Sequence, residues 1–427
     1  MKILLLTDAF PPEIRSSSHL MYELAEDLAT RGHRVGVITC QPRYNLVPAP
    51  SASTPDRALQ NRTVNLKVIR VRTPAIHNVS HWRRGLGQLW LPWAFSRAAR
   101  RLERPDAILL YSPPLTVGLA ADWLARRWKI PFVLNLQDLF PQNAIDLGAL
   151  RNPLPIATFR RLERYLYRRA AAITVHSPGN AAWLERRGVE FAKVHVIPNW
   201  VNTEQHRPQA NQTTNSFRSH LGLRGRFVVL FAGVMGYAQD METIIAAAAR
   251  LADEPRVVFL LVGEGSERRG IERQRDELRL ANLRLLPFVS REDYPALVAA
   301  CDVGLVTLKK TMKTPVVPSK LATYMAAARP VIASLNQESD ACAIVREAGC
   351  GLLVPPDRPD EMAAAIRRLL ADPDHAAALG RCGQQYALEH FSRSACVGRY
   401  EKLLAQLHSH RARLTPRDGG VTISPRR

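Results

Sequence analysis

The segment VVPSKLATYMAAARPVIAS, residues 316–334, places a lysine at the start of a helix-forming stretch. Lys320 follows Ser319, which is the predicted N-cap of the helix. A cation at the N-terminus of a helix opposes the helix dipole, so an anion is needed to stabilise it there. The spacing favours an anion-binding lysine, and the alternative is a solvated lysine at a helix start.

Small residues at two further places could let a phosphate approach the backbone. FAGVMGYAQD carries Gly233, Gly236 and Gln239, and VGEGSER carries Gly263 and Gly265. Phosphate recognition uses backbone N–H groups at helix starts, glycines and a cation. A single glycine after a strand is often only a turn. Here the glycines and Lys320 follow successive strands of one expected sheet, which favours a shared phosphate site.

Continuous apolar strands alternate with amphipathic helices in the first half of the chain. The expected strands cover residues 2–7, 35–40, 64–71, 107–112, 132–137, 171–176 and 193–198. Strands that are apolar throughout are typical of a parallel sheet covered on both faces. The pattern predicts a doubly wound, Rossmann-like α/β domain at residues 1–200.

A polar stretch rich in Pro, Asn and Thr, residues 197–217, predicts a linker. The alternation of apolar strands and amphipathic helices then resumes. The second set of expected strands covers residues 227–233, 256–263, 283–288, 303–308, 330–334 and 351–356. These predict a second Rossmann-like domain at residues 201–384, with a helix at about 385–408 joining the first domain. Residues 409–427 are predicted to be a disordered basic tail. Two such domains should face a cleft that holds the ligand at the carboxyl ends of the strands.

Composition limits the kind of partner. The 427 residues are 46% hydrophobic, and 59 basic against 38 acidic residues give a net charge of +21. This charge suits phosphorylated ligands, nucleic acid or an acidic membrane face, although a solvated Arg-rich surface is the alternative. The six cysteines lack metal-ligand spacing and are expected to be reduced thiols. No apolar run is long enough for a signal or a membrane span, so the expected location is cytoplasmic.

Two common nucleotide signatures are missing. The glycines at 263, 265 and 270 do not match GxGxxG, and no acidic residue ends a suitably placed next strand. No Walker A sequence is present either. The sequence therefore argues against NAD chemistry and ATP hydrolysis.

The ordered motifs resemble those of GT-B glycosyltransferases of the large retaining family 4. The likeness runs from MKILLLTDAFPPEIRSSSHL through IPNWVNTE and VGEG to PSKLATYMAAARPVIAS and EAGCGLLVPP. DLFPQNAIDLG, residues 138–148, is closer to bacterial enzymes that extend O-antigen, capsule or exopolysaccharide units, including aminosugar transferases. The motifs are specific for the fold and the broad family and poorly specific for the sugar.

The resemblance implies that the second domain binds a nucleotide-sugar donor. The base would lie near Pro287 and Phe288, the diphosphate at Gly236, Ser319 and Lys320, and Thr323 would be near the ribose. The family's E-x7-E glutamates are replaced by Pro315 and Thr323, and its Arg/Lys pair is missing from the loop after Gly233. Charge stabilisation would then depend on helix N-termini and Lys320, with Gln239 as a neutral donor.

The first domain would contribute groups near the acceptor. Glu13, Arg15 and Ser17 lie in the loop PPEIRSSS, where relatives often have paired glycines, and are expected to meet the acceptor or a phosphate. Asp138 ends a strand where relatives carry a polar pair, and the usual histidine is replaced by Gln137. Asp138 is the second predicted catalytic residue, for hydroxyls of the sugar or acceptor, and a turn-capping role is the alternative.

By resemblance, the leaving phosphate helps to deprotonate the acceptor on the same face of the sugar, so neither a metal nor a further cofactor is required. Residues 81–105 interleave four aromatic side chains, Trp82, Trp90, Trp93 and Phe95, with six arginines, and residues 159–172 are similar. Such segments are typical of helices that lie on anionic lipid, although a crossover helix packed on the sheet is the alternative. The membrane interpretation predicts a polyprenyl-diphosphate-linked glycan acceptor and peripheral attachment to the inner face of the plasma membrane.

Three rivals remain at this point. A nucleotide-sugar 2-epimerase of the same fold would need acidic residues and a histidine at the sugar, and only Asp138 is evident. A nucleic-acid binder would explain the charge but should show a recognised module. A non-catalytic sugar-nucleotide-binding scaffold would explain the missing glutamates.

Overall fold

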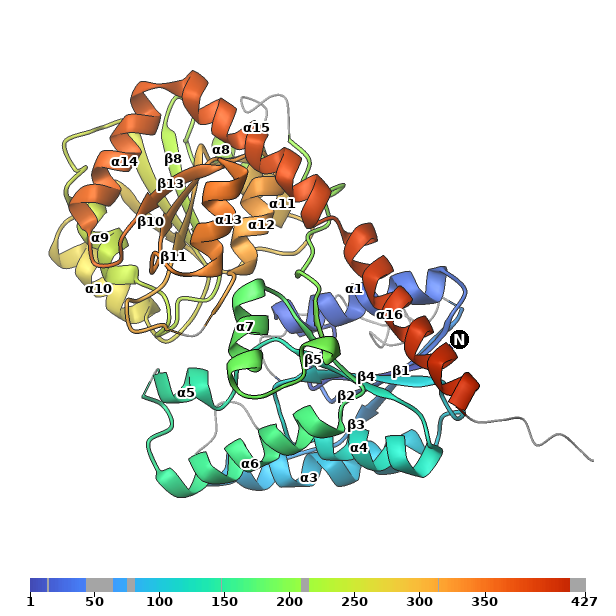
Figure 1. Ribbon diagram of the computed structural model, residues 1–427. Helices are drawn as coiled ribbons and strands as arrows, with labels where there is room; N and C mark the ends of the chain where they lie inside the picture. The colour runs from blue at the N-terminus through green and yellow to red at the C-terminus, as the bar shows by residue number, and fades with distance from the viewer. Residues whose placement is uncertain are drawn as a thin grey trace, which may run out of the picture.

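The computed structural model describes residues 1–13, 15–43, 64–74, 81–146, 148–208, 215–313 and 315–414, and it contains two parallel sheets (Figure 1). The first sheet has the strand order β3-β2-β1-β4-β5-β6-β7. Its strands are β1 (Lys2–Leu6), β2 (Arg34–Cys40), β3 (Leu66–Val71), β4 (Ala107–Ser112), β5 (Phe132–Leu136), β6 (Ala172–Val175) and β7 (Val194–Val196). The inner strands are buried on both faces, as their continuous apolar sequences predict.

Helices cover both faces of the first sheet. The helices of this unit are α1 (Ser16–Thr30), α3 (His81–Ala99), α4 (Val117–Trp128), α5 (Gln142–Asp146), α6 (Pro153–Arg169) and α7 (Pro178–Arg186), and the short α5 covers neither face. In Figure 1, α3, α4 and α6 lie below the sheet and α1 lies above it. A separate apolar core fills each side.

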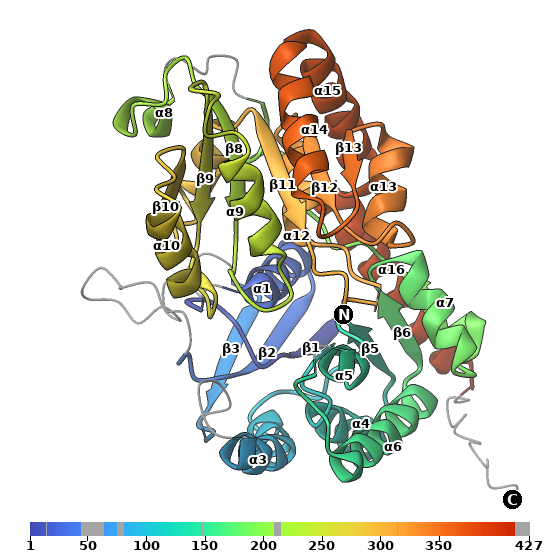
Figure 2. The ribbon, with the colours of Figure 1, turned by 90° about the vertical axis from the view of Figure 1, so that its left-hand side faces the viewer.

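The second sheet has the order β10-β9-β8-β11-β12-β13 (Figure 2). Its strands are β8 (Phe227–Ala232), β9 (Val257–Val262), β10 (Leu283–Leu286), β11 (Val303–Thr307), β12 (Val331–Ser334) and β13 (Gly351–Val354). The accompanying helices are α8 (Ser216–His220), α9 (Met241–Ala249), α10 (Arg268–Glu277), α11 (Tyr294–Ala299), α12 (Ser319–Ala326), α13 (Asp340–Ala348), α14 (Pro359–Ala371) and α15 (Pro373–His390). The predicted pair of Rossmann-like α/β units is confirmed.

The helix expected at about 385–408 is two helices. α15 ends at His390, and α16 (Arg393–Leu414) begins after a short break. At the break, Val201 N–H donates to the carbonyl of Phe391 at 2.9 Å, so both crossings between the sheets run side by side. Residues 409–414 belong to α16 and not to a disordered tail, and 415–427 lie outside the described residues.

α16 is held on the first sheet by apolar and charged contacts. Tyr400 is buried in the same core as α1, and Arg393 donates to the carboxylates of Glu26, at 2.8 Å, and Asp27. The end of the described chain therefore packs on its beginning.

Hydrogen bonds and an ion pair join the two units directly. The N–H of Gly179 donates to both carboxylate oxygens of Asp340, at 3.0 and 3.2 Å, and Arg291 pairs with the buried Glu23. Gly179 lies at the start of α7, directly after β6, and Asp340 lies at the start of α13, after β12. Glu23 lies within α1, the helix that follows β1, and Arg291 lies in the loop after β10. The carboxyl ends of both sheets therefore meet at the boundary between the two units, where the sequence places the ligand.

Candidate active site

Lys320 lies in the first turn of α12 and is only 9% exposed. Its Nζ donates a hydrogen bond to Oε1 of Gln239 at 2.8 Å and lies 3.7 Å from the centre of the Phe231 ring. Within the described part of the chain, no carboxylate forms an ion pair with it. The residue that the sequence favoured is thus a buried cation whose charge has no acidic partner among those residues.

Burial lowers the pKa of Lys320 to about 7. An ammonium removed from water loses solvation, and neither the amide of Gln239 nor the ring of Phe231 fully replaces it. A bound anion would favour the charged form and raise this pKa again. The site is therefore suited to a ligand that carries its own negative charge, such as a phosphate.

The loop after β8 brings Gly233 against the same lysine. A Cβ at this position would lie 3.6 Å from Cε and 3.7 Å from Nζ of Lys320, which is ordinary contact. The φ of +146° is the reason why a glycine is needed. The predicted association of Gly233, Gln239 and Lys320 is present in the structure.

Gly263 and Gly265 hold the two strand-end loops together. A Cβ on Gly263 would lie 1.9 Å from the carbonyl oxygen of Gly233, and one on Gly265 would lie 2.2 Å from that of Met235. The N–H of Met235 also donates to the carbonyl of Glu264 at 2.8 Å. These glycines let the loop after β9 support the loop after β8, a packing role that their sequence pattern did not reveal.

A turn and a helix cap position Gln239. Its N–H donates to the carbonyl of Gly236 at 2.9 Å, and the neighbouring Asp240 caps α9 by accepting from the N–H of Thr243. The N–H of Lys309, beyond β11, donates to the carbonyl of Ala238 at 2.9 Å. Gln239 is consequently fixed between two strand ends with its side-chain oxygen on Lys320.

The start of α12 differs from the prediction by one residue. Pro318 is the N-cap, and the exposed Ser319 is the first helical residue, so Ser319 does not cap the helix. Thr323 is buried and donates from Oγ1 to the carbonyl of Ser319 at 3.3 Å. Both residues share the first turns of α12 with Lys320.

Pro287 and Phe288 directly follow β10, with Pro287 exposed and Phe288 partly buried. The preceding carbonyl, of Leu286, accepts hydrogen bonds from the N–H of Gly263 at 3.0 Å and from Arg268 at 2.9 Å. The segment predicted to meet a base is thus hydrogen-bonded to the glycine loops, and among the described residues no hydrogen bond links it to Lys320.

In the first unit, Arg15 lies between two acidic residues. Its Nη1 is 3.1 Å from Oδ2 of Asp8 and 3.8 Å from Oε2 of Glu13, and both acids are buried. Ser17 is also buried, in the first turn of α1, and hydrogen-bonds with Tyr111. The predicted loop residues are therefore close together, and the sequence reasoning missed Asp8 as their partner.

Asp138 lies just beyond β5 and remains accessible to solvent. Desolvation by the surrounding protein raises the pKa of its carboxyl group, while the positive charge of Arg15 lowers it. Gln137, which replaces the expected histidine, is bound by its neighbours: its Nε2 donates to Asn135 at 2.8 Å, and its Oε1 accepts from Asn199 at 2.7 Å. Asp138 and Arg15 thus belong to one cluster at the carboxyl end of the first sheet.

His176, which the sequence reasoning also missed, lies beyond β6. Burial lowers its pKa to about 4, with Asp340 acting in the opposite direction. One ring nitrogen, Nε2, is 3.2 Å from Nδ2 of Asn180, and Nδ1 has no hydrogen-bond partner among the described residues. His176 directly follows the apolar strand β6, and nothing in that sequence indicated that a neutral histidine would lie near the boundary between the units.

Across the described ranges, no hydrogen bond or ion pair links the cluster of Arg15 and Asp138 to Lys320, so the two predicted groups are separate. No set of three or more His, Cys, Asp or Glu in those ranges is arranged to hold a metal ion. No helix in them is long and apolar enough to cross a bilayer.

Two domain families account for most of the chain. Residues 18–200 match the glycosyl transferase 4-like domain, and residues 226–372 match the glycosyl transferases group 1. The protein is therefore a glycosyltransferase with a GT-B fold. The glycosyl transferase 4-like domain forms the first unit, and the glycosyl transferases group 1 domain forms the second.

Individual relatives are distant. The chain is 26% identical over 390 residues to WcaI of Escherichia coli K12, assigned as a colanic acid biosynthesis glycosyl transferase, covering 88% of this chain and 93% of WcaI. It is 27% identical over 285 residues to WbjE of Pseudomonas aeruginosa, assigned as a glycosyltransferase, covering 66% of this chain and 71% of WbjE. The crystal structure of Anabaena HepE with UDP superposes with a TM-score of 0.72 at 20% identity, covering 95% of this chain and all of HepE, and this likeness shows the fold.

Proposed function

We propose that this protein is a retaining, metal-independent glycosyltransferase that moves a hexosyl or aminosugar group from a nucleotide sugar to a glycan acceptor. The observation that carries the proposal is the buried Lys320, an ammonium without a carboxylate partner among the described residues, beside Gly233 at the carboxyl end of the second sheet. A leaving diphosphate is the kind of group that such a site stabilises. HepE, which has the same fold, was crystallised with UDP and with UDP-glucose.

In the proposed reaction, the bond between the anomeric carbon and the donor diphosphate breaks as a bond to an acceptor oxygen forms. The acceptor proton passes to the leaving phosphate on the same face of the sugar. Lys320, Gln239 and the N-terminus of α12 hold the negative charge that develops on the diphosphate. Asp138 binds a hydroxyl of the sugar or acceptor, which is its catalytic contribution.

The proposed acceptor is a polyprenyl-diphosphate-linked intermediate of bacterial surface polysaccharide synthesis, such as an O-antigen, at the cytoplasmic face of the plasma membrane. Support comes from the assignment of WcaI to colanic acid synthesis and from the fold of WaaG, a glycosyltransferase of lipopolysaccharide biosynthesis.

The test is a nucleotide-release assay with UDP, GDP and TDP sugars, with and without a lipid-diphosphate glycan. We expect release that depends on the acceptor, persists in EDTA, gives a product with the anomeric configuration of the donor by NMR, and collapses in Lys320→Ala. Lys402→Ala, at an exposed lysine of α16, is the matched control and should retain full activity.

The outcomes separate the rival functions. Release of nucleotide without acceptor, or conversion of the donor to its 2-epimer, would contradict transfer and indicate epimerase-like or hydrolytic chemistry. Donor binding without turnover of any sugar would indicate a scaffold. Full activity of Lys320→Ala would remove the observation on which the proposal rests.

A further inference from the structure

Three helices form the outer layer of the first unit on the side opposite α1. α4 packs between α3 and α6, and the three lie together beneath the sheet (Figures 1 and 2). Their inner faces supply the apolar core on this side of the sheet. Their outer faces point away from both the sheet and the second unit.

Large apolar side chains are exposed on this layer from all three helices. The members are Leu89, Trp90 and Trp93 on α3, Leu119 and Trp123 on α4, and Leu154 and Tyr165 on α6. Trp90 is 47% exposed, Trp93 is 55% exposed and Leu154 is 77% exposed, and the two tryptophan rings lie 4.6 Å apart. Single exposed apolar residues are normal, but a set gathered on adjacent helices marks a contact surface.

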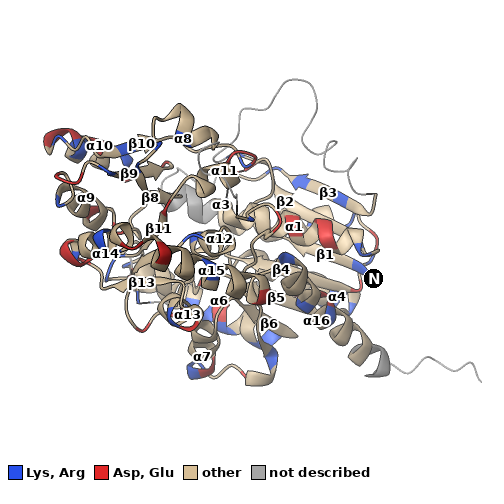
Figure 3. Cartoon of the chain, turned by 90° about the horizontal axis from the view of Figure 1, so that it is seen from above, with Lys and Arg blue, Asp and Glu red and all other residues tan. Residues whose placement is uncertain are grey.

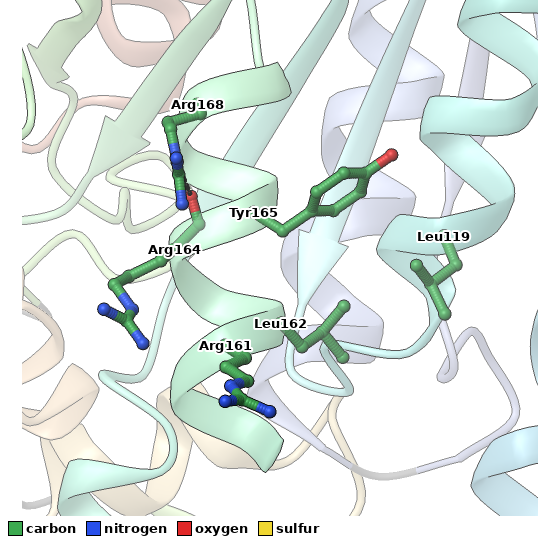
Figure 4. A pocket seen from close by; sticks show the side chains of 6 residues that line it. All are labelled: Leu119, Arg161, Leu162, Arg164, Tyr165 and Arg168. Atoms are coloured by element: carbon green, nitrogen blue, oxygen red, sulfur yellow. Dashed lines mark hydrogen bonds between the residues drawn. The ribbon is translucent and has the colours of Figure 1, made fainter. Parts of the chain in front are cut away.

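A groove of about 590 Å³ on the same layer is lined by arginines on an apolar base. Figure 4 shows Arg161, Arg164 and Arg168 along one side of α6, with Tyr165 directed toward α4 and Leu119. None of the three arginines forms an ion pair with a carboxylate of the described chain. Their charge is therefore available to an outside partner.

The acids of this layer cannot neutralise those arginines. α3, α4 and α6 contain only Asp122 and Glu163, and both are buried. Asp122 is already paired with Arg126 at 3.0 Å and Arg169 at 2.8 Å, and Glu163 accepts from Tyr167 at 2.9 Å. The second unit differs, because both signs of charge appear along α10 and beside α14 (Figure 3).

We infer that the outer layer of α3, α4 and α6 is a docking surface for an anionic lipid bilayer. Exposed Trp and Leu side chains would enter the interface between headgroups and acyl chains, and the arginines of α6 would bind lipid phosphates. This partner matches both features at once, whereas a nucleic acid would use the arginines and leave the aliphatic side chains without a contact. The inference goes beyond the proposed transfer reaction and does not depend on the identity of the sugar.

Binding of the full-length protein to vesicles tests the inference, with phosphatidylglycerol/phosphatidylethanolamine vesicles compared with phosphatidylcholine vesicles at 0.15 M salt. The triple variant R161Q/R164Q/R168Q should lose about 100-fold in partitioning to anionic vesicles, because each arginine near an anionic leaflet contributes about fivefold. The control R269Q/R273Q/R368Q removes the same charge from exposed arginines of α10 and α14, and it should lose far less.

A second variant separates insertion from charge. W90S/W93S keeps the net charge and changes two exposed side chains, so it should keep its circular dichroism spectrum and melting temperature. We expect weaker vesicle binding and less quenching of tryptophan fluorescence by brominated lipids than in the unmodified protein. Unchanged quenching would overturn the inference.

Three further results would also overturn it. An equal loss in both triple variants would mean that binding follows net charge and not this surface. Loss of duplex DNA binding in the α6 variant, without loss of vesicle binding, would indicate a nucleic-acid surface. Absence of vesicle binding by the unmodified protein while it transfers sugar to a water-soluble acceptor would refute the docking surface and leave the proposed reaction intact.

Discussion

Replacing Lys320 with methionine should abolish sugar transfer and at the same time stabilise the unliganded protein at pH 6. Burial lowers the pKa of this lysine from 10.5 to about 7, so the folded protein holds the charged form at a cost. The difference corresponds to about 5 kcal/mol of unfolding free energy at a pH below both values. Methionine has a similar length and carries no charge, so it removes this cost.

Part of the gain is offset. The ammonium contacts the ring of Phe231 and donates to Gln239, and the loss of both interactions should cost about 2 to 3 kcal/mol together. A net gain of about 2 kcal/mol remains, which raises the melting temperature by about 4 to 8 °C for a unit of this size. If Lys320 were retained only for stability, its replacement by methionine would lower the melting temperature.

The pH dependence supplies a second check on the same variant. Because the pKa is lower in the folded state, the unfolded chain binds more protons between pH 7 and 10.5, and the unmodified protein gains stability as the pH rises through this range. The advantage of Lys320→Met should therefore disappear by about pH 9.5. Melting curves at pH 6 and 9.5, with Lys402→Met as the exposed control, measure both effects. A variant that is less stable than the unmodified protein at pH 6, or one that still transfers sugar, would refute this account of the site.

Three more predictions concern the same site. The protein should take up a proton when it binds UDP at pH 8, because the diphosphate raises the pKa of Lys320 from about 7. Calorimetry in buffers of different ionisation enthalpy measures this proton uptake, which should be absent in Lys320→Met. Gly263→Ala should lower the free energy of unfolding by more than about 3 kcal/mol, because the new Cβ would overlap the carbonyl of Gly233. The control Gly270→Ala, at an open position in α10, should be neutral or stabilising when thermal unfolding is measured. Asp138→Asn should reduce kcat for transfer by at least about tenfold while leaving the Kd for UDP unchanged, and a weaker UDP affinity with normal kcat would contradict its assignment to sugar or acceptor hydroxyls.

The sequence predicted the strands well because parallel, doubly covered strands must be apolar throughout. β8 and β9 appear as unbroken apolar runs, and both were expected within one or two residues. The sequence analysis missed the break between α15 and α16, which lies where Phe391 accepts a hydrogen bond from Val201, a residue distant in sequence. Local periodicity contains no information about such a contact.

The candidate site was predicted in part for similar reasons. Lys320 and Gln239 could be found because polar residues at strand ends and helix starts stand out from their neighbours. Phe231 could not, because an aromatic residue in an apolar strand gives no sign that its ring will contact an ammonium group. Gly263 was expected to serve phosphate binding, and only the folded structure reveals that its missing Cβ makes room for the backbone of Gly233.

Arg15 and Lys320 were both expected to meet phosphate, and their surroundings now distinguish them. The guanidinium of Arg15 is already paired with Asp8 and Glu13, so a phosphate would have to compete with two carboxylates for it. Lys320 has no such competitor among the described residues, and an approaching diphosphate would supply the charge that its burial lacks. Since a cation binds an anion more strongly when its own charge is uncompensated, the diphosphate should bind to the second unit. The sugar would then extend toward Asp138 in the first unit, so that the two separate clusters act on opposite ends of one donor.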